Sequence, residues 1–383
     1  MSTFSFDGRP QKLPPATQEL LGPGLTAHSA YSLVRAHERN LIAHESPGDR
    51  DPRIIHLRVL GWMMIFSAND EMRAEMARAI VSCNDKLDQL VALGTFYRDH
   101  WIRTFKKIKG PTPRASGHIS RPSFDTISLF VAHFLDPAPK DYQAAKQNAL
   151  IRDGHRCMVT GRYDDTSYMK IQELHNELDA DPNTSVGVVE CAHIFARSTN
   201  TNFSDDVKRA YAGAAWTVLM RFGYSDFLEE LNGADIHRLS NLLTLDKDIH
   251  SWFDNLWLWF EPLVSIPFNI LGFISYFKTS QDDDPDSHRY KVQTTSSKLY
   301  ERVPRTVTFF NRTPTDIAPL PMPNKRYLAM HAACAKVAHM SGAAEALDDL
   351  DRRYDEGTVL AWDGGSADLL HHRLSTLQRV EVI

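Results

Sequence analysis

The feature that most constrains this chain is the run LSNLLTLDKDIHSWFD at 239–254, in which an apolar strand leads directly into a short helix. His250 and Asp254 are four residues apart, so on a helix they lie on the same face. The other face is apolar and is expected to be buried; it carries Ile249, Phe253 and Leu256. An imidazole and a carboxylate that converge from one helical turn form a half-site for a divalent cation.

A second strand is predicted upstream, in VGVVECAHIF at 186–195. Strand alternation places Cys191 and His193 on one face, with Glu190 and Ala192 on the other. A neutral imidazole near its ordinary pKa can take a proton from water at physiological pH. A metal-bound phosphate opposite it would have its charge neutralised and its leaving oxygen stabilised. His193 is therefore the candidate general base for phosphodiester hydrolysis.

Asn241 ends the turn that precedes the second strand, nine residues before His250. A side-chain amide both donates and accepts hydrogen bonds. At this position it could hold the backbone of the hairpin or orient the base. One more segment, RDGHRCMVTG at 152–161, opens the block that contains these residues.

These segments together resemble the HNH (ββα-metal) nuclease superfamily, and most closely the fungal-type HNH domain with AHI and HxxFD motifs. The resemblance covers residues 145–262, and the two spacings are also similar to those of colicin-type nucleases. It implies that His193 is the general base and that Asn241 braces the ββα loop. It further implies that His250 and Asp254 are metal ligands.

The resemblance also implies roles next to these residues. Glu190 stands where colicin-like members have a glutamate that organises the site, and Arg152 is the candidate partner of that glutamate. Ala192 is a departure, because many HNH enzymes have Asp or His there as a third ligand. A cation with two protein ligands would keep waters and substrate phosphate, which favours Mg²⁺ or Mn²⁺ over the alternative, Zn²⁺. The same departure could weaken or abolish nuclease activity.

The predicted fold class is α+β, with a ββα-metal core, a helical insertion, a mostly helical N-terminal region and a mixed C-terminal region. The expected parts are an irregular leader at 1–29, the helical region at 30–140, the HNH nuclease-like domain at 141–262 with its insertion at 205–233, and the C-terminal region at 263–383. Within the helical region, segment 54–66 fits a buried helix or a strand. Asp70 is the expected N-cap of a helix at 71–83.

The charge balance argues against a protein that only coats nucleic acid, because the net charge is −5 and the pI is about 6.4. A local basic cluster could still contact a phosphate backbone; it consists of Arg103, Lys106, Lys107 and Lys109. The alternative for this cluster is a solvated helix face.

Three observations predict an intracellular protein, cytoplasmic or nuclear, that does not enter a membrane. The N-terminus has no basic segment followed by an apolar one. The most apolar stretch, 256–277, is interrupted by Glu261, Pro262 and Pro267. The four cysteines form no CxxC pair, which is typical of a reducing compartment and gives no support to a four-cysteine zinc site.

The predicted function is a metal-dependent endonuclease that hydrolyses phosphodiester bonds in DNA, in preference to RNA. One alternative is an HNH scaffold reused as an enzyme for a small molecule. A closed, aromatic-lined cavity around His193 would favour it, and an open basic groove would exclude it. The other alternative is a catalytically silent module that binds nucleic acid or protein; salt-dependent DNA binding without cleavage would identify it.

Overall fold

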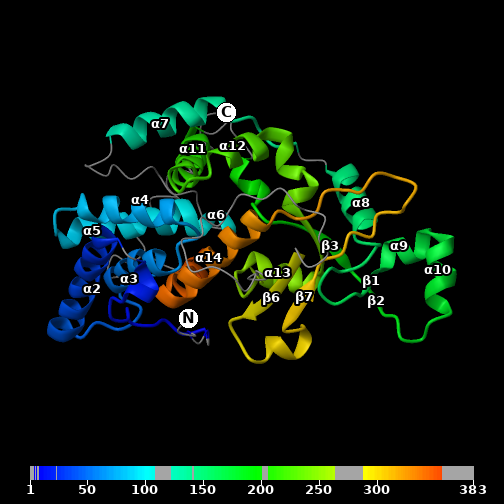
Figure 1. The fold of residues 1–383 in the computed structure, drawn as a ribbon, viewed down its shortest axis with the longest axis horizontal. Helices are drawn as coiled ribbons and strands as arrows, with labels where there is room; N and C mark the ends of the chain where they lie inside the picture. Colours follow the sequence, from blue (N-terminus) through cyan, green and yellow to red (C-terminus); the bar gives the residue numbers. More distant parts are fainter. Residues whose placement is uncertain are drawn as a thin grey trace, which may run out of the picture.

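The computed structural model describes residues 4, 6, 8–22, 24–107, 122–139, 142–200, 206–263 and 288–355. The described chain is mixed α+β and mostly helical, with small sheets beside the helices (Figure 1). The N-terminal part consists of α1 (Gln18–Leu21), α2 (Leu25–Glu45), α3 (Pro52–Ile65), α4 (Asp70–Val81), α5 (Leu87–Tyr97), the π-helical η1 (Arg98–Ile102) and α6 (Arg103–Phe105).

Capping side chains mark the starts of α3 and α4. The segment that fitted a helix or a strand is helix α3, because Asp51 accepts a hydrogen bond from Arg53 N at 2.8 Å and Pro52 occupies the first turn. Helix α4 corrects the expected cap by one residue. Asn69 is its N-cap and accepts from Met72 N at 2.6 Å, so Asp70 is already helical.

The middle of the chain contains α7 (Pro122–Phe134), α8 (Gln143–Arg152), β1 (Tyr163–Asp164), α9 (Asp165–Lys170), α10 (Gln172–Asp179), β2 (Val186–Gly187), β3 (Val189–His193), η2 (Arg197–Asn200), α11 (Asp206–Arg221), α12 (Ser225–Leu231), η3 (Gly233–His237), η4 (Leu239–Asn241), β4 (Leu242–Asp246) and α13 (Lys247–Asp254). Strands β1 and β2 form a short parallel pair. Helices α11 and α12 lie between β3 and β4 in sequence, where the insertion was expected, and α11 packs on α7.

Strands β3 and β4 form an antiparallel pair in which His193 lies opposite Leu242 and Val189 opposite Asp246. Helix α13 begins directly after β4 and packs on both strands. Its apolar face is buried as expected; Ile249, Phe253 and the following Leu256 are at most 3% exposed. Because α13 follows the strand pair directly and packs on both strands, its polar face lies beside β3.

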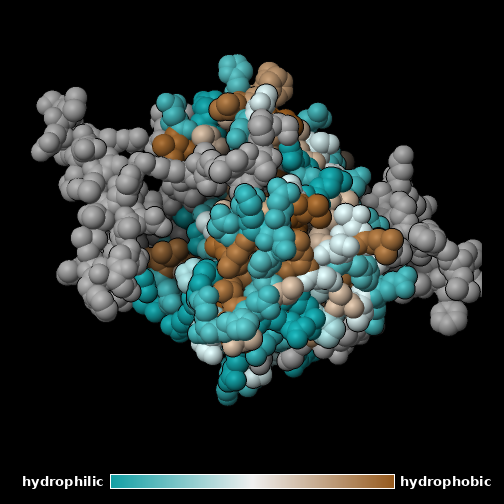
Figure 2. Space-filling model, turned by 90° about the vertical axis from the view of Figure 1, so that its left-hand side faces the viewer, coloured by the Kyte–Doolittle hydropathy of each residue, from teal (hydrophilic) through white to brown (hydrophobic). Residues whose placement is uncertain are grey.

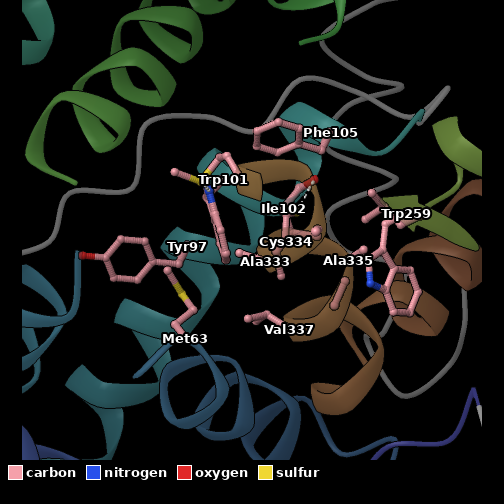
Figure 3. Close-up of a cluster of buried hydrophobic side chains, with 14 of the residues drawn as sticks. Met63, Tyr97, Trp101, Ile102, Phe105, Trp259, Ala333, Cys334, Ala335 and Val337 are labelled. Atoms are coloured by element: carbon pink, nitrogen blue, oxygen red, sulfur yellow. Dashed lines mark hydrogen bonds between the residues drawn. The ribbon is translucent and has the colours of Figure 1, made fainter. Parts of the chain in front are cut away.

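The C-terminal part adds β5 (Leu258–Pro262), β6 (Arg289–Thr294), η6 (Leu299–Arg302), β7 (Thr306–Thr308), α14 (Lys325–Ser341) and α15 (Ala343–Asp355). Strands β5, β6 and β7 form an antiparallel sheet in that order. Helix α14 packs on α3 on one side and on β5 on the other. Figure 3 shows the shared core, where Cys334 of α14 lies between Trp101 of η1 and Trp259 of β5.

Helix α14 also holds the end of α13 through two buried histidines. His331 stacks on Phe253 with ring centroids 3.8 Å apart, and its Nε2 donates to the Phe253 carbonyl at 3.2 Å. His339 Nε2 donates to the Leu256 carbonyl at 2.9 Å. Burial lowers the pKa of His331 to about 4, so this imidazole is neutral at physiological pH.

Among the described residues, no helix is both long and apolar enough to cross a membrane. The face in Figure 2 is largely hydrophilic, with hydrophobic side chains gathered near its centre.

We expect Gly94→Ala to destabilise the N-terminal helices. A Cβ on Gly94 of α5 would lie 2.3 Å from the His56 carbonyl oxygen of α3, so the two helices must separate. Overpacking of this kind costs typically 1–3 kcal/mol, more than the roughly 1 kcal/mol that Ala gains over Gly in a helix. The midpoint of thermal unfolding should fall. Gly48→Ala is the control, since nothing lies within 4 Å of its Cβ position; equal midpoints for both variants would contradict the close α3–α5 contact.

Candidate active site

His193 ends β3, and its imidazole lies among aromatic rings and a second histidine. Its Nε2 is 2.9 Å from His237 Nδ1, and the Tyr142 ring meets it edge-on at 5.3 Å. Burial, aided by the neighbouring His237 and the Arg197 charge, lowers the pKa of His193 to about 3. The imidazole is therefore neutral at physiological pH and can accept a proton.

Asn241 is fully buried and uses its whole amide on the backbone. Its Oδ1 accepts from Phe195 N at 2.8 Å, and its Nδ2 donates to the carbonyls of Phe195 at 3.1 Å and Ile236 at 2.9 Å. Phe195 is two residues after His193, and Ile236 is directly before His237. Asn241 therefore acts as a positioning residue, because no polar atom of its side chain is left for a substrate.

Helix α13 presents His250 between two carboxylates. His250 Nδ1 donates to Glu190 Oε2 at 2.7 Å, and His250 Nε2 lies 3.4 Å from Asp254 Oδ2. Burial opposes the charged imidazolium, but the hydrogen bonds and charges of Asp254 and Glu190 outweigh it and raise the pKa of His250. The structure thus brings together three of the residues that the sequence indicated.

His193 and this carboxylate-histidine group come from opposite faces of β3. Cys191 clusters with Ala149 of α8 and Leu242 of β4, whereas Glu190 turns toward α13. Their opposite directions follow from strand alternation. The charges of His250 and Asp254 both act on the pKa of His193. His193 and the carboxylate-histidine group are therefore electrostatically coupled.

The donor set on α13 fits a divalent cation with few protein ligands. Within the described ranges, no group of three or more His, Cys, Asp or Glu side chains is arranged to hold a metal. His250 Nε2 and Asp254 Oδ2 nevertheless face each other, while Glu190 accepts the Nδ1 proton. A carboxylate that holds the far ring nitrogen fixes the tautomer of a metal-binding histidine. Ala192 is fully buried and supplies no ligand.

Arg152 does not pair with Glu190, which corrects the sequence expectation. Its guanidinium is fully buried and forms two hydrogen bonds of 2.7 Å with Asp153. It also donates to the carbonyls of Leu239, Leu242 and Pro321. A buried guanidinium must satisfy its donors where it lies, and here it clamps the turn on either side of Asn241 instead of contacting the carboxylate of Glu190.

The expected basic cluster does not form one exposed surface. Lys106 is 4% exposed and its Nζ pairs with Asp348 Oδ1 at 2.8 Å, so it faces the interior. Lys107 is exposed, and its Nζ lies 3.9 Å from Asp254 Oδ2, beside the candidate metal ligands. Arg103 is partly buried, and its charge acts on Asp99 and Tyr211. Lys109 lies outside the described residues.

Two cavities, of about 570 and 500 Å³, lie beside the site and are not lined by His193. The larger is bordered by Asp246, Lys247 and Trp252 at the start of α13. The smaller lies between α8 and α9 and includes Lys146 and Lys170. Neither of these two is the aromatic-lined chamber around His193 that a reused small-molecule scaffold predicts.

Sequence reasoning missed three residues at His193. His237 bonds to it, Tyr142 stacks on His237 with centroids 5.0 Å apart, and the Arg197 guanidinium lies 5.6 Å from the Tyr142 ring. No spacing indicated them, because Tyr142 precedes α8 and His237 follows the α11–α12 segment. The one available signal was that His237 stands four residues before Asn241.

Comparison with known proteins agrees with this geometry. Residues 157–261, which span β3, β4 and α13, match the family model described as HNH endonuclease. No curated protein and no solved structure shows significant similarity to the chain. HNH nucleases act on nucleic acid and generally use a divalent metal, so this segment indicates nuclease activity. The chain therefore carries a domain of the HNH endonuclease superfamily.

Proposed function

We propose that the protein is a metal-dependent endonuclease that hydrolyses phosphodiester bonds, with DNA as its substrate in preference to RNA. In this proposal β3, β4 and α13 are the ββα-metal unit of the HNH domain. The observation that carries it is a neutral, partly buried imidazole, His193, whose pKa is affected by the charges of the His250–Asp254 pair on α13. A base and a cation half-site are the two elements that phosphodiester hydrolysis requires.

His193 is proposed to take the proton from the attacking water. Its low pKa keeps it neutral, and the negative charge of an incoming phosphate would raise that pKa and make it a stronger base. Arg197 lies near the same imidazole and offers a cation to the phosphate. Asn241 holds the backbone on both sides, so the base keeps its orientation during the proton transfer.

His250 and Asp254 are proposed to hold Mg²⁺ or Mn²⁺, with Glu190 fixing the imidazole from behind. When bound there, such a cation would neutralise charge on the scissile phosphate and stabilise the leaving oxygen. With two protein ligands, most coordination positions of the cation would be filled by water and phosphate oxygens. An oxygen-rich shell of this kind suits Mg²⁺ or Mn²⁺ better than Zn²⁺. Lys107 beside Asp254 adds a positive charge that a phosphate backbone can approach.

A catalytically silent nucleic-acid-binding module is the second candidate, and Ala192 is the observation that favours it. The buried methyl group supplies no ligand where many relatives of this superfamily have one. This candidate predicts salt-dependent DNA binding without cleavage under any metal.

Plasmid cleavage by the full chain tests the proposal. We expect cleavage with Mg²⁺ or Mn²⁺ and none with EDTA. His193→Ala should lower the rate by about 100-fold or more, because general-base catalysis contributes roughly 10²–10⁴-fold. The control is His133→Ala, an exposed position on α7 that should cleave like the wild type. Metal-independent cleavage, or full activity without His193, would refute the mechanism; binding without cleavage would identify the silent module.

Mn²⁺ affinity, measured by calorimetric titration, tests the metal half-site. We expect His250→Ala to abolish binding and Glu190→Gln to weaken it roughly 10-fold or more, because the carboxylate charge that holds His250 Nδ1 is lost. His175→Ala is the matched control. His175 and Asp179 on α10 form a pair with the same four-residue spacing and the same 3.4 Å distance as His250 and Asp254. Equal affinities for His250→Ala and His175→Ala would exclude the site.

The pH dependence of Mn²⁺ binding follows from the pKa of His250. Only the neutral imidazole binds a cation, and neighbouring carboxylates raise this pKa above its ordinary value of 6.5 against the effect of burial. A proton therefore competes at higher pH than for an ordinary histidine. Affinity should fall about tenfold per pH unit below the raised pKa. An affinity that is constant from about pH 8 to pH 6 would contradict the assignment of His250 as a ligand.

A further inference from the structure

We infer that His237 is a positioning residue that fixes the tautomer of His193, so that Nδ1 of His193 is the basic nitrogen. This inference rests on the proposed function, in which His193 is the general base. It assigns a role to a side chain that neither the motif nor its spacing indicated.

The Pro139 carbonyl can only accept a hydrogen bond. His237 Nε2 lies 3.0 Å from this oxygen, so Nε2 carries a proton and donates it. A neutral imidazole has one N–H, and His237 Nδ1 is then an acceptor. His193 Nε2 lies 2.9 Å from His237 Nδ1 and must be the donor.

The proton of His193 is assigned from its contact with His237 Nδ1. Because Nε2 of the neutral His193 carries the proton, Nδ1 has the free lone pair. The basic Nδ1 of His193 therefore depends on the hydrogen bond between His237 Nε2 and the Pro139 carbonyl.

The surroundings hold His237 in the required orientation. Its ring stacks on Tyr142 at an interplanar angle of 8°, and only 7% of the residue is exposed. Asn241 Nδ2 donates to the carbonyl of Ile236, directly before His237 in the chain. A rotation of the His237 ring would break both the stacking and the bond to Pro139, so the acceptor for His193 stays in place.

Two variants separate this role from simple packing. His237→Phe keeps a ring against Tyr142 and removes the acceptor. His237→Asn loses the ring, and its Oδ1 can accept from His193 Nε2 in place of His237 Nδ1. We expect His237→Phe to lower kcat for plasmid cleavage by about 100-fold at unchanged KM. We expect the kcat of His237→Asn to stay within about tenfold of the wild type. A role of His237 in packing alone would not predict this rescue.

The tautomer itself is read by nitrogen NMR of ¹⁵N-histidine-labelled full chain, with the His193 signals assigned from the spectrum of His193→Gln. We expect a protonated Nε2 and a bare Nδ1 for His193 in the wild type and in His237→Asn. The preference should be lost in His237→Phe, whose thermal midpoint reports that it is folded.

This readout needs no cleavage, so it separates the inference from the proposed function. A wild-type His193 with its proton on Nδ1 would overturn the inference even in an active nuclease. So would an unchanged tautomer in His237→Phe, or equal losses of activity in the two variants. The assigned tautomer and its loss in His237→Phe would support the inference even if the protein cleaved no DNA.

Discussion

The buried amide of Asn241 is the interaction on which the candidate active site depends. Its three hydrogen bonds tie the backbone after β3 to the backbone before β4, across the segment that contains α11 and α12. A buried polar group without partners costs roughly 1–3 kcal/mol, so the amide and the two backbone segments are held in one arrangement. His193 and His237 lie at these two places, and their contact follows from the brace.

The carboxylate side of the site has a different support, which comes from helix α14. Helix α14 holds α13 through the His331–Phe253 stacking and the His339 bond to the Leu256 carbonyl. Because α14 also packs on α3, the N-terminal helices contribute to the position of His250 and Asp254. A variant that moves α14 can therefore change the proposed metal binding without touching either proposed ligand.

The sequence predicted the parts of the site that depend on local geometry. Helical spacing was enough to pair His250 with Asp254, and strand alternation was enough to separate Glu190 from His193. The remaining contacts depend on chain segments that meet only after folding. Lys106 pairs with Asp348 of α15, and Arg152 bonds to carbonyls of the Asn241 turn instead of Glu190. No local pattern encodes such partners.

The charged groups on the two sides of β3 differ, and this difference bears on the absence of an acidic residue at position 192. The α13 side holds two carboxylates around His250, enough negative charge to balance a divalent cation without an acidic residue in place of Ala192. The other side sets His193 beside Arg197 and a second imidazole, an environment that disfavours protonation and favours a phosphate. An aspartate at position 192 would add charge to the side that already has it. The alanine at position 192 is thus compatible with the proposed cation site. In that site Glu190 would act by holding His250, and not directly on the cation.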